Sequence, residues 1–246
     1  MSDRGKNWTR EETMLAFELY CTIPDGEDTI HNKNIIDLSQ AIGRSVNSVK
    51  LKLQNFKSFD ASYTQNGRIG LRHGSKLDEN ICREFFHNWD ALILETNDIK
   101  NRLGLTQDEN ARFVGYDKVR LHKERIGQVF FRQALLAIYG YRCCFTGINI
   151  PELLRASHIK SWSEANDINE KTNPQNGLLL NALHDAAFDK GFITISFDYK
   201  IIVSKYLLTN SNGNYFSMIN GQKMLLPSKF LPDKKFIEYH NKKFKG

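Results

Sequence analysis

The segment that most constrains the fold of this chain is residues 143–195, because its hydrophobic pattern changes several times over a short distance. An apolar stretch ends in Ala-Ser-His-Ile, a polar loop follows, and Asn176-Gly177 then precedes a Leu-rich run. Short apolar runs bounded by turn residues indicate buried strands, and an Asn-Gly pair is a strong turn signal. From His184 onward the spacing becomes helical, with residues four apart on one face. The segment is therefore predicted to form a strand, a loop, a second strand and a short helix.

Three polar residues of this segment are spaced as metal-dependent phosphodiester hydrolysis requires. His158 ends the first predicted strand, Asn176 comes 18 positions later, and His184 follows eight positions after that. The reaction needs a nucleophilic water, a base that takes its proton, and a cation beside the phosphate. This pattern resembles the HNH endonucleases, and the resemblance covers residues 143–195. The preceding run RIGQVFFRQALLAIYGYRC is similar to the helix that leads into such domains in the restriction-enzyme-like branch of that family.

The resemblance implies a role for each residue. His158 would be the general base, because an imidazole titrates close to neutral pH. Asn176 would orient that ring through its side chain or its backbone carbonyl. The catalytic set is then His158, Asn176 and His184, and the metal ligands are His184, Asp185 and Asp189. They would hold one divalent ion per site, with Mg²⁺ expected and Mn²⁺ or Ni²⁺ as alternatives.

The sequence departs from the family pattern in three places. Ser157, a poor ligand, stands where most members have a metal-binding Asp or His. The helical ligand of the family comes nine positions after the middle Asn, which is Asp185, whereas His184 comes eight positions after it. Because one residue turns a helix by about 100 degrees, spacing alone leaves this choice open. Residues 143–146 and 181–184 stand in place of two Cys-x-x-Cys pairs, so no structural zinc is expected, although Cys143 and Cys144 with His184 are a minor metal-binding alternative.

Each of these residues also has a purely structural explanation. His158, near Trp162, could be a buried core histidine, and His184 with Asp185 could form an ion pair at a helix end. Asn176-Gly177 could be only a hairpin turn. The joint spacing of these residues within a basic chain favours the metal site over the separate explanations.

Charge and length indicate the partner and the compartment. The formal net charge is +6 and the isoelectric point is about 9.0. Lys and Arg contacts to phosphates release counterions and drive much of nucleic-acid affinity. The sequence contains no apolar run near 18 residues and no charged-then-apolar leader, so we expect a cytoplasmic protein that does not enter a membrane. Double-stranded DNA is the predicted partner.

The first 60 residues predict three short helices. Thr9 is the expected N-cap of the first helix, with Glu12 in the capping-box position. A second helix is predicted over residues 34–42 and ends at Gly43, and a third starts at Ser45 with an apolar stripe. This arrangement describes a helix-turn-helix unit. The motifs Trp-Thr-x-Glu-Glu and Gly-Arg-Ser-x-x-Ser-Val resemble the Myb or homeodomain-like class.

In such a unit the third helix would enter the major groove and present its polar side chains to DNA. The predicted DNA-contacting residues are Arg44, Asn47, Lys50, Lys52, Gln54 and Lys57. Of these, Lys50 and Lys57 are expected to touch phosphate. The alternative is an ordinary solvated helix face, because lysine-rich faces also serve solubility.

Apolar residues at helical spacing over 77–103, with Gly104 as the stop, predict a helical connector. The predicted organisation is a helix-turn-helix-like DNA-reading domain over residues 1–74, this connector over 75–123, and an HNH nuclease domain with a hairpin and a basic tail over 124–246. The fold class is α+β, with an N-terminal helical domain and a C-terminal ββα-metal domain.

The sequence therefore predicts a metal-dependent DNA endonuclease of the restriction type in prokaryotic defence, with or without a requirement for modified DNA. One such site cuts one strand, so double-strand cleavage would need a homodimer or successive nicks. Two alternatives are kept open. One is a DNA-binding protein on a decayed nuclease scaffold, suggested by Ser157 and the missing zinc cysteines. The other is a nuclease that acts on RNA.

Overall fold

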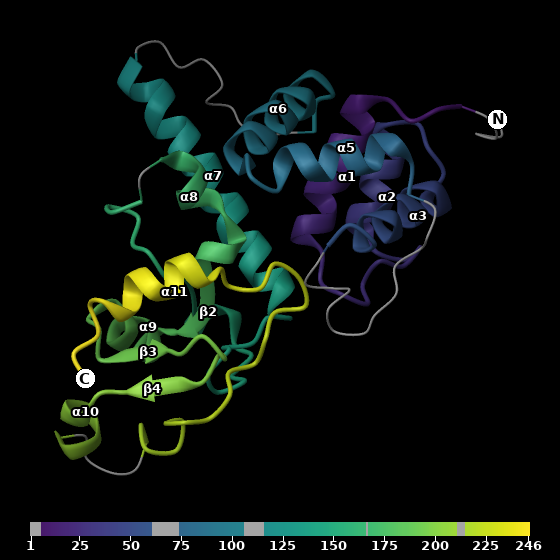
Figure 1. The fold of residues 1–246 in the computed structure, drawn as a ribbon. Coiled ribbons are helices and arrows are strands. Elements are labelled where there is room, and N and C mark those ends of the chain that lie inside the picture. The colour runs from purple at the N-terminus through teal and green to yellow at the C-terminus, as the bar shows by residue number, and fades with distance from the viewer. Residues whose placement is uncertain (1–5, 61–73, 106–115, 166, 211–214) are drawn as a thin grey trace. The chain divides into compact units, whose positions relative to one another are not determined.

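The chain forms two compact units in the computed structural model, Met1–Phe130 and Phe131–Gly246, which Figure 1 traces from purple to yellow. The structure describes residues 6–60, 74–105, 116–165, 167–210 and 215–246, with the side chains of 116–120 left out. The described helices and the two small antiparallel sheets give a mixed α+β fold, as the sequence predicts. Within these ranges no helix combines the length and the apolar character needed to cross a bilayer.

The first unit contains a group of packed helices that begin and end at the residues expected from capping chemistry. Its helices are α1 (Arg10–Thr22), α2 (Lys33–Ala41), α3 (Val46–Lys57), α5 (Lys76–Phe85) and α6 (Trp89–Arg102). Thr9 and Glu12 form the predicted capping box at α1, and Ser45 caps α3. Gly43 follows α2 with a φ of 65°, a backbone angle that glycine adopts without the steric cost of a Cβ. The predicted starts and the glycine stop are confirmed.

The continuous helical pattern expected over 77–103 is two helices. α5 and α6 are separated by residues 86–88, and Asn88 has a non-helical φ of −145°. The break lets the apolar faces of both helices pack on α1, because a straight helix of this length would carry its second half away from the core. Phe85 and Trp89, on either side of the break, are both fully buried. α5 and α6, which lie in the range predicted to be a connector, are therefore part of the core of the first unit.

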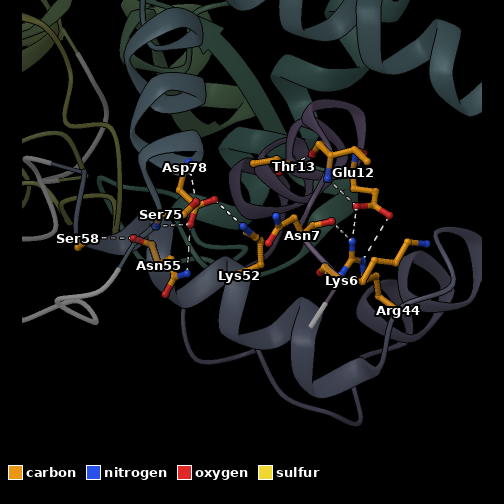
Figure 2. Close-up of polar contacts among 11 residues, drawn as sticks. Lys6, Asn7, Glu12, Thr13, Arg44, Lys52, Asn55, Ser58, Ser75 and Asp78 are labelled. Atoms are coloured by element: carbon orange, nitrogen blue, oxygen red, sulfur yellow. Dashed lines mark hydrogen bonds and ion pairs between the residues drawn. The ribbon is translucent and has the colours of Figure 1, made fainter. Parts of the chain in front are cut away.

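A buried cation joins α3 to the capping box of α5, as Figure 2 shows. Ser75 and Asp78 form that box, in which the Asp78 carboxylate accepts the Ser75 N–H at 3.0 Å. The same carboxylate receives the Lys52 ammonium at 2.6 Å and the Asn55 amide at 3.2 Å. The side chains of Lys52 and Asp78 are 5% and 0% exposed. Because water cannot solvate either charge, each is stabilised by the other.

The capping box of α1 is used in the same way (Figure 2). Glu12 receives the Arg44 guanidinium at 2.8 Å, and Arg44 also donates to the backbone carbonyls of Lys6 and Asn7 at 2.7 Å each. Trp8 lies beside this pair, with its ring 5.0 Å from the Arg44 guanidinium. The turn before α3 and α3 itself are thus tied to the starts of α1 and α5 by charge-assisted hydrogen bonds, which are stronger than neutral ones.

The second unit has a two-stranded core followed by a helix. Its described elements are the C-terminal part of α7 (Tyr116–Ile138), η1 (Pro151–Leu153), β1 (Leu154–His158), α8 (Ile168–Thr172), η2 (Pro174–Asn176), β2 (Gly177–Asn181), α9 (Ala182–Asp189), β3 (Ile193–Ile195), β4 (Ile201–Val203), α10 (Lys205–Asn210) and α11 (Lys234–Asn241). β1 and β2 pair antiparallel, and α9 packs against both strands. The predicted order of strand, loop, strand and helix is confirmed. β3 and β4 form the predicted hairpin, and α11 packs on β3.

We expect the Lys52→Met variant to lose about 3–5 kcal/mol of the free energy of unfolding, because it leaves the Asp78 carboxylate buried without its cation. The matched control is Lys33→Met, since the Lys33 side chain is 84% exposed in its pair with Asp37 and should change stability by less than about 1 kcal/mol. Chemical denaturation of both variants measures the difference. Equal losses would contradict a structural role for the buried pair.

Candidate active site

His158 lies at the end of β1, where it faces Gly177 of β2 in the strand register. Its Nε2 is 2.8 Å from the backbone carbonyl oxygen of Lys171, which can only accept a hydrogen bond. In the neutral ring Nε2 therefore carries the proton and Nδ1 is the basic nitrogen. The ring also stacks on Phe131 of α7, with centroids 3.9 Å apart and an interplanar angle of 8°. Both contacts fix the direction in which the imidazole presents its nitrogens.

Burial lowers the pKa of His158 below its ordinary value. Three smaller effects act on the same ring: the hydrogen bond to the Lys171 carbonyl and the nearby Asp185 carboxylate raise the pKa, and the Lys171 ammonium lowers it. The net shift keeps the imidazole neutral at neutral pH, which is the state a general base requires.

Asn176 is fully buried and organises the loop between the two strands. Its side-chain oxygen accepts the Lys160 N–H at 2.8 Å, and its amide donates to the carbonyls of Lys160 at 3.1 Å and Glu170 at 3.0 Å. Its own carbonyl accepts the Ile159 N–H at 2.9 Å. None of these printed bonds reaches the imidazole, so the predicted direct contact with the His158 ring is corrected. The orienting carbonyl belongs to Lys171, and Asn176 acts on it through the loop.

Helix α9 presents Asp185 and Asp189 on one face, since they are four residues apart. The Asp185 carboxylate is close enough to His158 to influence its pKa. Burial and the Asp185 charge together raise the pKa of Asp189. Within the described residues no group of three or more His, Cys, Asp or Glu side chains could hold a metal by itself. Two carboxylates do suit Mg²⁺, which is commonly held by one or two carboxylates together with waters and substrate phosphates.

His184 lies on a different face of α9 from the pair of carboxylates. It is fully buried, with Nδ1 3.8 Å from the Cys143 sulfur and with the rings of Phe145, Tyr215 and Phe216 around it at centroid distances of 5.5–6.2 Å. Burial lowers its pKa to about 4, and its Nε2 has no hydrogen-bond partner in the described part of the chain. The prediction that His184 serves catalysis and metal binding does not fit this packing. One residue further on, a turn of about 100°, Asp185 is partly exposed and its charge acts on the pKa of His158.

The departures noted in the sequence have structural counterparts. Ser157 is 3% exposed, and its hydroxyl has no hydrogen-bond partner among the described residues. Cys143 and Cys144 are free thiols buried under β2, where Cys144 N–H donates to the Leu179 carbonyl at 2.8 Å. Burial raises the pKa of Cys144 well above its ordinary value, so this thiol stays protonated and is a poor metal ligand.

Three of the six predicted DNA contacts are held inside the first unit. Arg44 and Lys52 form the buried pairs of Figure 2, and the Lys57 ammonium lies 3.1 Å from Asp25 and 3.0 Å from Asp28. This corrects the prediction for Arg44, Lys52 and Lys57, because cations held in this way are not available to phosphates. Asn47 is exposed and Lys50 and Gln54 are partly exposed, so these three side chains of α3 keep the predicted role as a hypothesis.

Sequence reasoning missed Phe131 and Lys171 as neighbours of the imidazole, and it named Trp162 only as a sign that His158 could be a core residue. Phe131 lies on a helix that was assigned only a supporting role, and Lys171 acts through a backbone atom, which leaves no signal in side-chain identity. Trp162 is edge-on to His158 at a centroid distance of 5.6 Å. Its position four residues after a candidate base was the only available hint.

A family model described as HNH endonuclease matches residues 143–196. These residues form an HNH endonuclease domain. The solved structure of a modification-dependent TagI restriction endonuclease is similar over 46% of this chain and 37% of that chain, at 17% identity and a TM-score of 0.32. The chain thus spans well under half of the length of that enzyme. A comparison with curated proteins gave no match.

The positive charge of the chain is concentrated in the unit that contains the HNH domain. Residues 131–246 contain 15 Lys and Arg against nine Asp and Glu, whereas residues 1–130 contain 19 of each. The formal net charge of +6 therefore belongs to the second unit. Since phosphate affinity follows local positive charge, this unit is better suited than the first to attract a polyanion.

The unit with the HNH domain should lose stability in acid because burial lowers the pKa of both His184 and His240 to about 4. Between pH 6.5 and 4 the unfolded chain binds protons that the folded one does not, so the free energy of unfolding falls as the pH falls. Each histidine contributes up to about 3 kcal/mol to this loss. We expect His184→Leu to reduce the acid-dependent loss by about half of that sum, measured by urea denaturation at pH 7, 5 and 4. An unchanged slope would contradict the burial of a neutral His184.

Gly177 should tolerate no side chain, because a Cβ there would lie 2.6 Å from Leu135 Cδ1 and 2.8 Å from Phe131 Cζ. We expect Gly177→Ala to cost about 1–3 kcal/mol of the free energy of unfolding by overpacking. It should also displace Phe131 from the His158 ring and lower any activity that needs that ring. Unfolding curves and the proton resonances of the His158 ring check both effects. If Gly177→Ala kept both the stability and the His158 ring resonances of the parent, the close packing at Gly177 would be contradicted.

Proposed function

We propose that the protein is a metal-dependent endonuclease that hydrolyses phosphodiester bonds in DNA. The observation that supports this best is the geometry around His158: an imidazole with a fixed tautomer, a lowered pKa and a carboxylate of α9 close by. The match to the HNH endonuclease family model supports phosphodiester hydrolysis as the class of reaction.

In the proposed reaction, His158 Nδ1 takes a proton from the water that attacks the scissile phosphate in line. The Lys171 carbonyl holds Nε2–H and thereby stabilises the imidazolium that forms. Asp185 and Asp189 would hold a divalent ion, and such an ion neutralises charge on the leaving oxygen. Asp185 also lies near enough to His158 to favour its protonated form after the transfer. Asn176 keeps the loop that carries Lys171 in place.

DNA as the substrate is supported by the net charge of the unit that contains this site. The restriction type, a requirement for modified DNA, and a reading role for Asn47, Lys50 and Gln54 of α3 are parts of the same proposal. One site of this kind cuts one strand, so a double-strand break would need two copies of the chain or two successive nicks. Mg²⁺ is the proposed ion because two carboxylates and a phosphate meet its preference for oxygen ligands.

Plasmid cleavage by the full chain with Mg²⁺, Mn²⁺ or Ni²⁺ tests this proposal. We expect nicking by the parent and a loss of about 100-fold or more in His158→Ala and in Asp185→Asn. The matched control is His184→Leu, the neighbouring residue on α9, which should keep cleavage within about 10-fold of the parent because His184 packs in the interior. A reversed result, with His184 essential and Asp185 dispensable, would overturn the assignment of the metal-binding face.

A second function is supported by one observation, the unpartnered Ser157 hydroxyl next to the proposed base. Without a ligand at this position the chain could be a DNA-binding protein that no longer cuts. DNA retention by both the parent and His158→Ala, without cleavage under any of the three ions, would favour this function. Cleavage of RNA but not DNA would redirect the substrate assignment and leave the chemistry unchanged.

A further inference from the structure

Lys171 contacts the proposed base through its backbone and also carries a positively charged side chain. It lies in the short helix α8, and its carbonyl oxygen is the hydrogen-bond partner of His158 Nε2. Its ammonium lies over the Trp162 ring, which is itself edge-on to the His158 ring. The hydrogen bond of its carbonyl therefore holds the Lys171 backbone beside the imidazole, and the flexible side chain extends from this fixed position.

The Lys171 ammonium is held by an aromatic face and by no carboxylate in the described part of the chain. It lies 5.0 Å from the centroid of the Trp162 ring, and Trp162 is edge-on to His158 at 5.6 Å. Two other lysines around this loop differ in this respect. Lys160 pairs with Glu170 at 2.6 Å, and Lys243 pairs with Glu164. A cation–π contact positions a charge without neutralising it, so Lys171 keeps its full charge for a ligand.

The charge belongs to the same loop residue whose carbonyl orients the proposed base. A general base can take a proton only from a water within hydrogen-bond reach, and that water attacks the phosphorus. A phosphodiester positioned for attack therefore lies close to the imidazole, and Trp162, which holds the Lys171 ammonium 5.0 Å from its ring centroid, is edge-on to that imidazole at 5.6 Å. The carboxylates of α9 would repel a substrate phosphate, and a lysine of the loop with no carboxylate partner among the described residues would offset that repulsion.

We propose that Lys171, held against Trp162, binds a phosphate of the nucleic acid at the site of cleavage. This inference rests on the proposed nuclease function and assigns the side chain that binds the substrate anion beside His158. Lysine suits this role because its ammonium donates three hydrogen bonds from a mobile stem. The indole limits that mobility before the substrate arrives, which reduces the entropy lost on binding.

Substitutions at position 171 isolate this charge, because any side chain there keeps the backbone carbonyl that orients His158. We would compare the parent with Lys171→Met, Lys171→Gln and Lys171→Arg. The control Lys200→Met removes the same charge from an exposed site at the β3–β4 turn, where Lys200 pairs with Asp198 at 3.1 Å. Thermal unfolding of every variant establishes that it is folded, and Lys171→Gln replaces Lys171→Met if the apolar side chain destabilises the unit.

Two measurements on a short DNA duplex are needed. The first is kcat/KM for cleavage with the active metal ion, which we expect to fall about 10- to 100-fold in Lys171→Met and to recover largely in Lys171→Arg. The second is the dissociation constant in EDTA as a function of salt. There the slope of log affinity against log salt should become shallower by about one in Lys171→Met. Lys200→Met should keep the parent kcat/KM.

The outcomes separate this inference from the proposed function. If the parent cuts DNA and Lys171→Met matches it in kcat/KM and in salt slope, the inference is overturned and the nuclease function stands. If the parent cuts nothing, the nuclease function fails, and the binding measurement alone decides the inference. In that case weaker binding by Lys171→Met than by Lys200→Met supports a phosphate contact, and equal binding rules it out.

Discussion

The hydrogen bonds of the buried Asn176 side chain carry the geometry on which the candidate site depends. They join the backbone of Lys160 to that of Glu170, so the loop after β1 folds back over the end of its own strand. The next residue, Lys171, then meets His158 with its carbonyl. An amide suits this position because one side chain offers both an acceptor and two donors. A carboxylate at 176 would lack the donors and leave the buried Lys160 carbonyl unsatisfied, at a cost of about 1–3 kcal/mol, and would also lose the bond to the Glu170 carbonyl.

Two consecutive residues of helix α9 have different roles: His184 packs in the interior, and Asp185 is a proposed metal ligand. His184 packs among aromatic rings and Cys143, where burial lowers its pKa to about 4, while the charge of the partly exposed Asp185 acts on the His158 ring. The spacing in the sequence left these two residues undecided, and the phase of the helix against the strands selects between them. That phase is set by what can be buried: a neutral imidazole enters an apolar interior at modest cost, whereas a carboxylate without a partner does not.

The first unit shows how a basic pattern can mislead. Its third helix has the cations expected of a DNA-reading helix, and the helix boundaries were predicted closely from Thr9, Gly43 and Ser45. Capping chemistry is local, which explains that success. The ion-pair partners of these cations are distant in the sequence, since Lys52 pairs with Asp78, 26 positions later in the chain. The formal net charge of the first unit is zero, which is consistent with ion pairs inside it, while the excess positive charge lies in the unit of the HNH domain.

The sequence by itself determined the order of strand, loop, strand and helix, the hairpin after it and the chemical family, and it predicted His158 as the candidate base. These depend on hydrophobic periodicity and turn residues, which act over a few positions. Only the tertiary structure decided that the Asp185 charge acts on His158, that Lys171 supplies the orienting carbonyl, and that Phe131 from α7 stacks on the ring. Contacts of this kind join residues 13 to 27 positions apart through backbone atoms and ring faces, which residue identity does not encode.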